Sequence, residues 1–237
     1  IRDRAGIIVP GVPVIYDGND KDAAEVIAAK AKELGSPAYK VIQAGAKVLG
    51  NNKDGIDFSL EDDYYGDTRF HIPFIAWYQV MNASLALTTM EVLKDRIPVT
   101  MEQLQAGIAN TRWQGRMETI LPGVIVDGAH NEDGVRRFVE TAERFQKEYP
   151  LTLLFSAVND KDYQDMIHTI CSRIKFRKVV TTEVGGYREV PSAELAEIFC
   201  KEGCKDIGNS DNIEEAFHMA HEAKGCLLYT SPSPRDA

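Results

Sequence analysis

The sequence predicts an α/β protein whose C-terminal half folds as a Rossmann-like domain around a mostly parallel sheet. From Val124 onwards, short apolar runs of the buried-strand type alternate with amphipathic helical segments. The first of these runs, residues 124–126, ends in Asp127, and an amphipathic segment follows. Strands that alternate with helices in this way form parallel sheets with helices on their faces.

The first half of the chain also alternates strands and helices, but it includes an antiparallel element. Apolar runs at residues 12–16 and 41–42 predict strands, and residues 20–34 between them carry apolar side chains at helical spacing. Alternating apolar and polar residues around an acidic turn then predict two antiparallel strands. These strands are expected at residues 55–60 and 64–72, and helices at residues 73–93 and 101–109.

Periodicity defines the remaining elements of the second half. The segment after Asn131 places apolar residues on one helical face, and the residues that begin at 160, 191 and 212 repeat this pattern. Two further apolar runs, at residues 151–155 and 178–182, predict strands between these helices.

Composition and charge narrow the kinds of partner that this chain can have. Of the 237 residues, 44% are hydrophobic, and the formal net charge is −9. Nucleic-acid binders concentrate Lys and Arg on one face, so this balance excludes a nucleic-acid partner. The sequence also has no apolar run as long as a membrane span and no signal peptide at its start. We therefore expect a cytoplasmic monomer that binds small molecules.

The cysteines indicate neither a zinc site nor a secretory disulfide framework. Cys171, Cys200, Cys204 and Cys226 lack the paired C-x-x-C spacing of zinc ligands. Cys200 and Cys204 lie one helical turn apart, where we expect half-buried thiols and not a redox pair. All four cysteines are expected to be reduced.

The stretch that begins at Asp127 is where the sequence indicates chemistry. In open α/β sheets, ligands bind at the carboxyl ends of the strands, where the next helix presents free N–H groups to anions. A charged residue at such a strand end therefore suggests a ligand site. The alternative is that Asp127 caps the helix and His130 is a surface residue of its first turn. These residues alone do not decide between the two.

Two motifs flank this strand. Gly115-Arg116-Met117-Glu118 precedes it, and Asp127-Gly128-Ala129-His130-Asn131 follows it. This pairing, at this spacing, resembles the start of the C-terminal domain of the folylpolyglutamate synthase and dihydrofolate synthase family, within the Mur ligase superfamily. Ala5-Gly6-Ile7-Ile8 with Pro10-Gly11-Val12-Pro13-Val14 is similar to the end of the family's central ATPase domain. Tyr78-Gln79-Val80-Met81-Asn82 is similar to its (His/Tyr)-Gln-x-x-Asn helix.

The resemblance implies a fold, an activity and a set of site residues. The fold is the end of a Mur-ligase-type central ATPase domain followed by a Rossmann-like C-terminal domain. The activity is the addition of glutamate to the carboxylate of a folate or of dihydropteroate through an acyl phosphate, with ATP and Mg²⁺ as cofactors. In the family, Asn82 and Gln79 would bind adenine, Asp127 the ribose hydroxyls, and Arg116 the phosphates, while His130 would line the place where phosphate and glutamate meet. For Asn82, a hydrogen-bonded polar residue within a mostly buried helix is the alternative.

The resemblance also sets the expected domain limits and shows two departures from the family. We expect the ATPase part at residues 1–111, the C-terminal domain at residues 112–226, and a tail at residues 227–237 that looks like a translated adaptor or cloning scar. Arg4 stands where the family has a Lys that is carbamylated to bind metal. The phosphate-loop pattern G-x-x-x-x-G-K-[ST] does not occur in these residues. We therefore expect a fragment that lacks activity by itself and whose phosphate loop lies upstream.

Other interpretations stay open from the sequence. The chain could belong to a peptidoglycan-precursor ligase of the same superfamily, or it could be a degenerate nucleotide-binding module without ligase activity, as Arg4 would permit. Asp160-Lys161-Asp162 matches a family motif, but acidic residues in a first helical turn are explained by the helix dipole, so we assign it no catalytic role. His218 and His221 are expected to be surface residues of one helix.

Overall fold

The chain forms two units, and each is described by itself. The computed structural model describes residues 5–230 except 53, 184, 187 and 224. The first unit is Ile1–Arg112 and the second is Trp113–Ala237. This division falls one residue after the boundary that the sequence indicates. Arg4, which departs from the family's metal-site lysine, lies outside the described residues.

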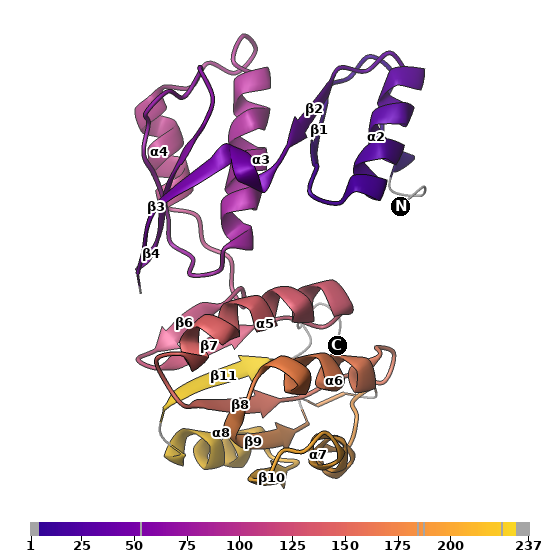
Figure 1. The fold of residues 1–237 in the computed structure, drawn as a ribbon, viewed down its shortest axis with the longest axis vertical. Helices are drawn as coiled ribbons and strands as arrows, with labels where there is room; N and C mark the ends of the chain where they lie inside the picture. Colours follow the sequence, from indigo (N-terminus) through magenta and orange to yellow (C-terminus); the bar gives the residue numbers. More distant parts are fainter. Residues whose placement is uncertain (1–4, 53, 184, 187, 224, 231–237) are drawn as a thin grey trace. The chain divides into compact units, whose positions relative to one another are not determined.

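A parallel strand pair with a crossover helix opens the first unit (Figure 1). The strands β1 (Val14–Asp17) and β2 (Ala38–Val41) pair in parallel, and α2 (Lys21–Glu33) connects them. The helix begins after Asp20, whose side chain accepts a hydrogen bond from the N–H of Ala23 at 3.0 Å. The predicted strand-helix-strand unit is therefore present.

An antiparallel sheet follows in the first unit. A short 3-10 helix, η1 (Gln43–Gly45), leads into β3 (Ala46–Asn52), which pairs with β4 (Gly55–Leu60), and β4 pairs with β5 (Phe70–Ile72). The sequence predicts β4 with the observed bounds, but it does not predict β3. The end of β3, residues 50–52, is Gly-Asn-Asn, and these residue types are depleted in strands and hide the alternation. Of the strand expected at residues 64–72, only Phe70–Ile72 is a strand, because residues 64–67 form a turn.

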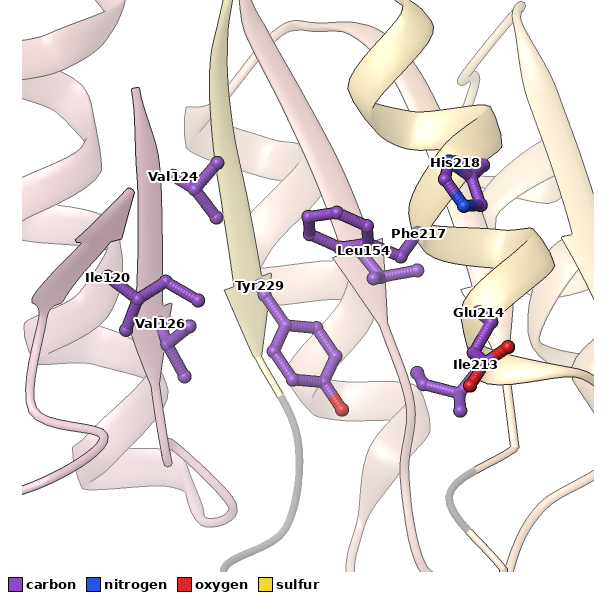
Figure 2. A pocket seen from close by; sticks show the side chains of 9 residues that line it. All are labelled: Ile120, Val124, Val126, Leu154, Ile213, Glu214, Phe217, His218 and Tyr229. Atoms are coloured by element: carbon purple, nitrogen blue, oxygen red, sulfur yellow. The ribbon is translucent and has the colours of Figure 1, made fainter. Parts of the chain in front are cut away.

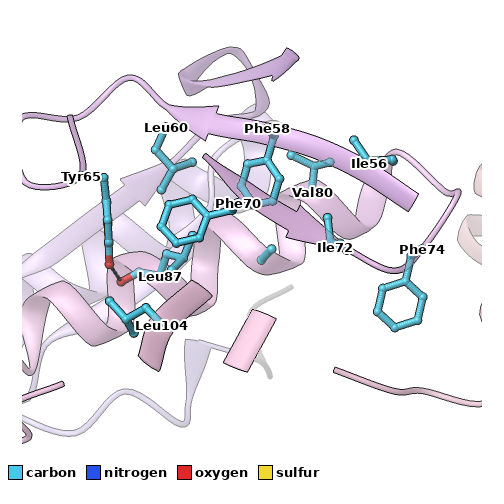
Figure 3. Packing of buried hydrophobic residues seen from close by; sticks show 11 residues of the cluster. Ile56, Phe58, Leu60, Tyr65, Phe70, Ile72, Phe74, Val80, Leu87 and Leu104 are labelled. Carbon is cyan, nitrogen blue, oxygen red and sulfur yellow. Dashed lines mark hydrogen bonds between the residues drawn. The ribbon is translucent and has the colours of Figure 1, made fainter. Parts of the chain in front are cut away.

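Two helices cover this antiparallel sheet and close its core (Figure 3). The helix α3 (Tyr78–Val92) contacts all three strands, and α4 (Met101–Ala109) contacts β5. The buried Tyr65 hydroxyl donates a hydrogen bond to the Leu87 carbonyl of α3 at 2.6 Å, so the phenol is satisfied inside the core. The core includes Ile56, Phe58, Leu60, Phe70, Ile72, Val80 and Leu104.

A six-stranded sheet forms the centre of the second unit (Figure 1). Its strands are β6 (Glu118–Leu121), β7 (Val124–Asp127), β8 (Leu151–Phe155), β9 (Phe176–Thr182), β10 (Ile207–Ser210) and β11 (Cys226–Thr230). They lie in the order β10-β9-β8-β11-β7-β6, and all neighbours are parallel except β6 and β7. The predicted Rossmann-like fold with a mostly parallel sheet is confirmed.

Helices lie on both faces of this sheet. They are α5 (Glu132–Gln146), α6 (Tyr163–Arg173), α7 (Ser192–Lys201) and α8 (Ile213–Glu222). The connections through α5, α6 and α7 step along the sheet in one direction, and right-handed crossovers place these helices on one face. The connection through α8 steps back and covers β8, β9 and β10 from the other face. Among the helices described, none has the length and apolar content to cross a membrane.

The position of β11 corrects the predicted end of the fold. The sequence assigns residues 227–230 to a tail, yet β11 lies between β8 and β7 and pairs with both. Leu228 in its middle is 0% exposed. The prediction was wrong because a short apolar run beside polar residues does not reveal its pairing partners. Residues 231–237, the rest of the predicted tail, lie outside the described residues.

Candidate functional site

Asp127 is a buried carboxylate at the carboxyl end of β7. Its side chain is 4% exposed, and Oδ2 accepts a hydrogen bond from the backbone N–H of Met117 at 2.9 Å. Burial raises the pKa of Asp127 to about 6, although the Met117 N–H, the positive charge of Arg116, the Ala129 N–H and the charge of His130 oppose the rise. The carboxylate is therefore mostly ionised at pH 7 and lies among groups that stabilise its charge.

The helix that follows is capped by Asn131 and not by Asp127. The Asn131 side-chain oxygen accepts a hydrogen bond from the N–H of Gly134 at 2.8 Å, at the start of α5. Asp127 instead accepts a hydrogen bond from the backbone N–H of Met117, which precedes β7 in the chain, whereas α5 follows β7. The interpretation of Asp127 as the cap of α5 is therefore wrong.

The turn at residues 115–118, here called the Arg116 turn, is tied to the end of β7. The N–H of Gly128 donates to the Gly115 carbonyl at 2.7 Å, and the N–H of Gly115 donates to Glu118 Oε2 at 2.9 Å. Gly115 and Met117 have φ of 66° and 48°. Gly adopts this left-handed conformation freely, but a Met does so rarely, so the surrounding bonds hold Met117 there. The turn thereby fixes the half-buried Arg116 near Asp127.

His130 is held in one orientation by the same loop. Its Nδ1 lies 2.7 Å from the Gly128 carbonyl oxygen. A carbonyl only accepts, so Nδ1 carries the proton that points at it. The Thr230 hydroxyl at the end of β11 donates to the Ala129 carbonyl at 3.1 Å, which anchors the loop to the centre of the sheet. Arg116, Asp127 and His130 are thus brought together at one strand end.

The other two predicted site residues form a pair on α3 in the first unit. Asn82 Nδ2 donates to Gln79 Oε1 at 2.8 Å, one helical turn away. Gln79 is 8% exposed, whereas Asn82 is exposed. Asn82 therefore presents an exposed amide oriented by a buried neighbour. It is also a hydrogen-bonded polar residue on a mostly buried helix, so this geometry fits both the adenine contact and its alternative.

Sequence patterns did not reveal the bonds that organise the strand end. Glu118 belongs to the Gly115–Glu118 motif, but its bond to Gly115 depends on the left-handed backbone of the turn. Thr230 lies in the segment that the sequence assigns to a tail. The Asn131 cap could have been found, because an Asn three residues before Gly134 with two acidic residues between them is a helix-start signal.

The second unit also has a hollow that is separate from the strand end (Figure 2). It measures about 470 Å³ and lies on the sheet face beside α8, where Ile120, Val126, Phe217 and Tyr229 line it. Most of its lining is apolar. His218 and Glu214 lie at its α8 side. It does not include Arg116, Asp127 or His130, so it is a separate feature from the strand end.

The acidic motif at residues 160–162 serves the fold. Asp162 accepts a hydrogen bond from the N–H of Asp165 at 3.2 Å and caps α6, and Asp160 Oδ2 accepts from Arg188 Nη1 at 2.9 Å. Within the described ranges, no three His, Cys, Asp or Glu residues are grouped to hold a metal ion.

These features coincide with a known family of domains. Residues 115–230 match the model of the family described as Mur ligase, glutamate ligase domain. The chain belongs to the Mur ligase family. Within that family, it is related to the folylpolyglutamate and dihydrofolate synthases. It is 32% identical over 186 residues to the dihydrofolate synthase/folylpolyglutamate synthase of Bacillus subtilis, a match that covers 73% of this chain and 42% of that protein.

Other relatives agree with this assignment. The folylpolyglutamate synthase of Lacticaseibacillus casei is 31% identical over 173 residues, which cover 70% of this chain and 40% of the relative. The crystal structure of Thermotoga maritima folylpolyglutamate synthase matches this chain with a TM-score of 0.77 at 22% identity, and the match covers 97% of this chain and 53% of that protein. The Mycobacterium tuberculosis folylpolyglutamate synthase, solved with ADP and AMPPCP, has a TM-score of 0.79 at 21% identity, with coverages of 98% and 56%. The chain spans less than half the length of the two curated relatives.

Proposed function

We propose that this chain is part of an ATP-dependent ligase that adds glutamate to the carboxylate of a folate or of dihydropteroate. The observation that carries the proposal is the buried, mostly ionised Asp127 beside Arg116 and His130, at the end of β7 in a Mur ligase glutamate ligase domain. In an α/β sheet, a strand end of this kind is where ligands bind. The curated relatives named for folate synthesis support the choice of substrate class.

The reaction would proceed by activation of a carboxylate. ATP transfers its terminal phosphoryl group to the acceptor carboxylate, which gives an acyl phosphate and ADP. The amine of glutamate then attacks the acyl carbon, and the tetrahedral intermediate collapses to an amide as phosphate leaves. The protein's task is to hold the nucleotide and glutamate in position and to stabilise the transferring charge.

Each candidate residue suits one part of this task. Asp127 has an ionised carboxylate whose oxygens can accept hydrogen bonds from ribose hydroxyls in addition to the one from Met117. Arg116 supplies a cation for the phosphates, and the turn limits its freedom. His130, held in one orientation by the Gly128 carbonyl, would line the place where phosphate and glutamate meet.

Adenine recognition is assigned to α3 of the first unit. The Asn82 amide has a donor and an acceptor that match adjacent N6 and N7 of adenine, and Gln79 orients it. The first unit would accordingly be the end of a central ATPase domain. A cytoplasmic monomer is the simplest setting for these substrates. Mg²⁺ belongs to the proposed reaction, where it would neutralise charge on the phosphates.

The test replaces the matching part of the Lacticaseibacillus casei folylpolyglutamate synthase with this chain. We expect the purified chimaera to release ADP only when glutamate and a folate or dihydropteroate are both present. The same chimaera is offered a nucleotide-linked muramyl acid as acceptor. ADP release with the muramyl acid as acceptor, and none with a folate or dihydropteroate, would assign the chain to peptidoglycan synthesis. A chimaera that binds ADP but ligates neither acceptor would support a nucleotide-binding module instead.

A further inference from the structure

Two thiols from different helices meet in the second unit. Cys171 lies near the end of α6, and Cys204 follows α7; their Sγ atoms are 3.7 Å apart. Both side chains are partly exposed. A disulfide bond is about 2.05 Å long, so the sulfurs need to approach by only about 1.7 Å.

The backbone after α7 holds Cys204 in this place. Gly203 has a φ of 91°, and its N–H donates to the Cys200 carbonyl at 3.0 Å. The N–H of Cys204 donates to the Phe199 carbonyl at 3.1 Å. These two bonds form the left-handed turn that ends many helices, and they fix the direction in which the chain leaves α7. The proximity of the thiols therefore rests on an ordered helix end.

Solvent reaches the edge of the protein where these thiols lie. His168, one turn before Cys171 on α6, pairs with Glu202 at 3.0 Å, and their side chains are 67% and 30% exposed. The hydrogen bond from Cys171 lowers the pKa of Cys204, while the same bond and burial raise the pKa of Cys171. The two thiols thus share one proton after the first ionisation, with the negative charge on Cys204.

We propose that Cys171 and Cys204 form a dithiol site that reacts with a low-molecular-weight disulfide, such as oxidised glutathione, to give an intramolecular disulfide. The Cys204 thiolate attacks one sulfur of the small disulfide, whose S–S bond breaks and releases one thiolate. Cys171 then gives up its proton to solvent and attacks the Cys204 sulfur of the mixed disulfide, which releases the second small thiol. Two protein thiols are oxidised and one small disulfide is reduced to two thiols.

The site lies away from the strand end that carries Asp127. In a parallel α/β sheet the connecting helices run against the strands, so the ends of α6 and α7 lie at the amino edge of the sheet. The disulfide would tie α6 to the end of α7 without covering the carboxyl edge. It closes a loop of 33 residues, which restricts the unfolded chain and stabilises the second unit.

The other two cysteines provide internal controls. Cys200 is exposed on α7, and Cys226 is buried in β11. Exposure alone would favour Cys200 as the reactive thiol, whereas the geometry favours Cys171 and Cys204. The cysteines that become linked therefore show whether exposure or geometry determines the reaction.

The experiment treats the purified chain with oxidised glutathione, blocks remaining thiols with iodoacetamide and maps the linked peptides by mass spectrometry. We expect a Cys171–Cys204 peptide pair, a Tm raised by about 5 °C or more, and reversal by dithiothreitol. Cys200→Ser should leave the link intact, and Cys171→Ser should keep glutathione on Cys204. A wild-type map in which Cys200 carries the links, or in which Cys171 and Cys204 carry only separate glutathiones, would overturn the proposal. The wild-type map decides even if a variant fails to fold.

Discussion

The backbone N–H of Met117 donates a hydrogen bond to Asp127 Oδ2 at 2.9 Å. One carboxylate at the end of β7 therefore holds the turn that precedes β6, and it does so while 4% exposed. The bond also explains how Met117 keeps a φ of 48°, a conformation that a Met rarely adopts. Asp127 thus has a structural bond to the Arg116 turn in addition to its proposed role toward a ligand.

The raised pKa of Asp127 makes the stability of the second unit depend on pH. Its pKa is 3.8 in the unfolded chain and about 6 in the folded protein, so the folded state holds the proton more tightly. This contribution to stability is complete below about pH 4 and is lost as the pH rises through 6. In Asp127→Asn the amide oxygen still accepts from Met117 but does not titrate. The free energy of unfolding of the variant minus that of wild type should therefore increase by up to about 3 kcal/mol between pH 4 and pH 7.

Urea unfolding of both proteins at several pH values measures this difference. Carboxyl groups elsewhere, such as Glu91 and Glu183, contribute equally to both proteins and cancel. The matched control is Asp133→Asn, because Asp133 is an exposed residue of α5. A difference between Asp127→Asn and wild type that stays constant with pH would refute the raised pKa.

Arg116 is expected to control the titration of Asp127. Its positive charge lowers the pKa of the carboxyl against the larger effect of burial. Arg116→Gln should raise the pKa of Asp127 further, and Arg116→Lys, which keeps the charge, should change it less. An NMR titration of the Asp127 side-chain carboxyl carbon gives the value directly. An unchanged pKa in Arg116→Gln would mean that the Arg116 turn does not hold the guanidinium near Asp127.

Glu118 should stabilise the Arg116 turn through its bond to the Gly115 N–H at 2.9 Å. Glu118→Ala leaves this N–H without its side-chain partner, which typically costs about 1 kcal/mol. Glu118→Gln keeps an acceptor oxygen and should recover most of the loss. Thermal unfolding compares the three proteins, and hydrogen exchange of the Gly115 amide reports on the bond itself. Equal exchange in wild type and Glu118→Ala would contradict this assignment.

The cap of α5 should be sensitive at Asn131. Asn131→Ala removes the acceptor for the Gly134 N–H and should destabilise the second unit by about 1 kcal/mol, whereas Asn131→Ser should have a small effect. Because Asn131 is separate from the buried carboxylate, the effect should not vary between pH 4 and pH 7. A pH-dependent loss like that of Asp127 would place both residues in one hydrogen-bond network.

Because β11 lies in the centre of the sheet, shortening one of its buried side chains should strongly lower the stability of the second unit. Leu228 is 0% exposed, and Leu228→Ala should destabilise the second unit by about 2–5 kcal/mol. Leu121 in β6, at the edge of the same sheet, is 51% exposed, so Leu121→Ala should change stability by less than about 1 kcal/mol. If both variants lower the free energy of chemical unfolding by the same small amount, the interpretation of this segment as a tail would be restored.

The sequence by itself predicted those features that depend on neighbours within a few residues. Helices with a regular apolar face, such as α5, follow from spacing alone, and strands such as β8 follow from short apolar runs between turn residues. The Gly115–Glu118 and Asp127–Asn131 motifs together indicate the strand end at which Arg116, Asp127 and His130 meet.

Only the tertiary structure decided how distant segments meet. The edge strands β6 and β10 and the central strand β11 are each defined by partners elsewhere in the chain, and no local pattern encodes a partner. The left-handed Met117 exists because Asp127, ten residues later, holds its N–H. The contact of Cys171 with Cys204 likewise joins residues 33 positions apart. Periodicity reports which side chains are buried, and the pairing of buried surfaces, which sets register and site geometry, is fixed only when the whole sheet forms.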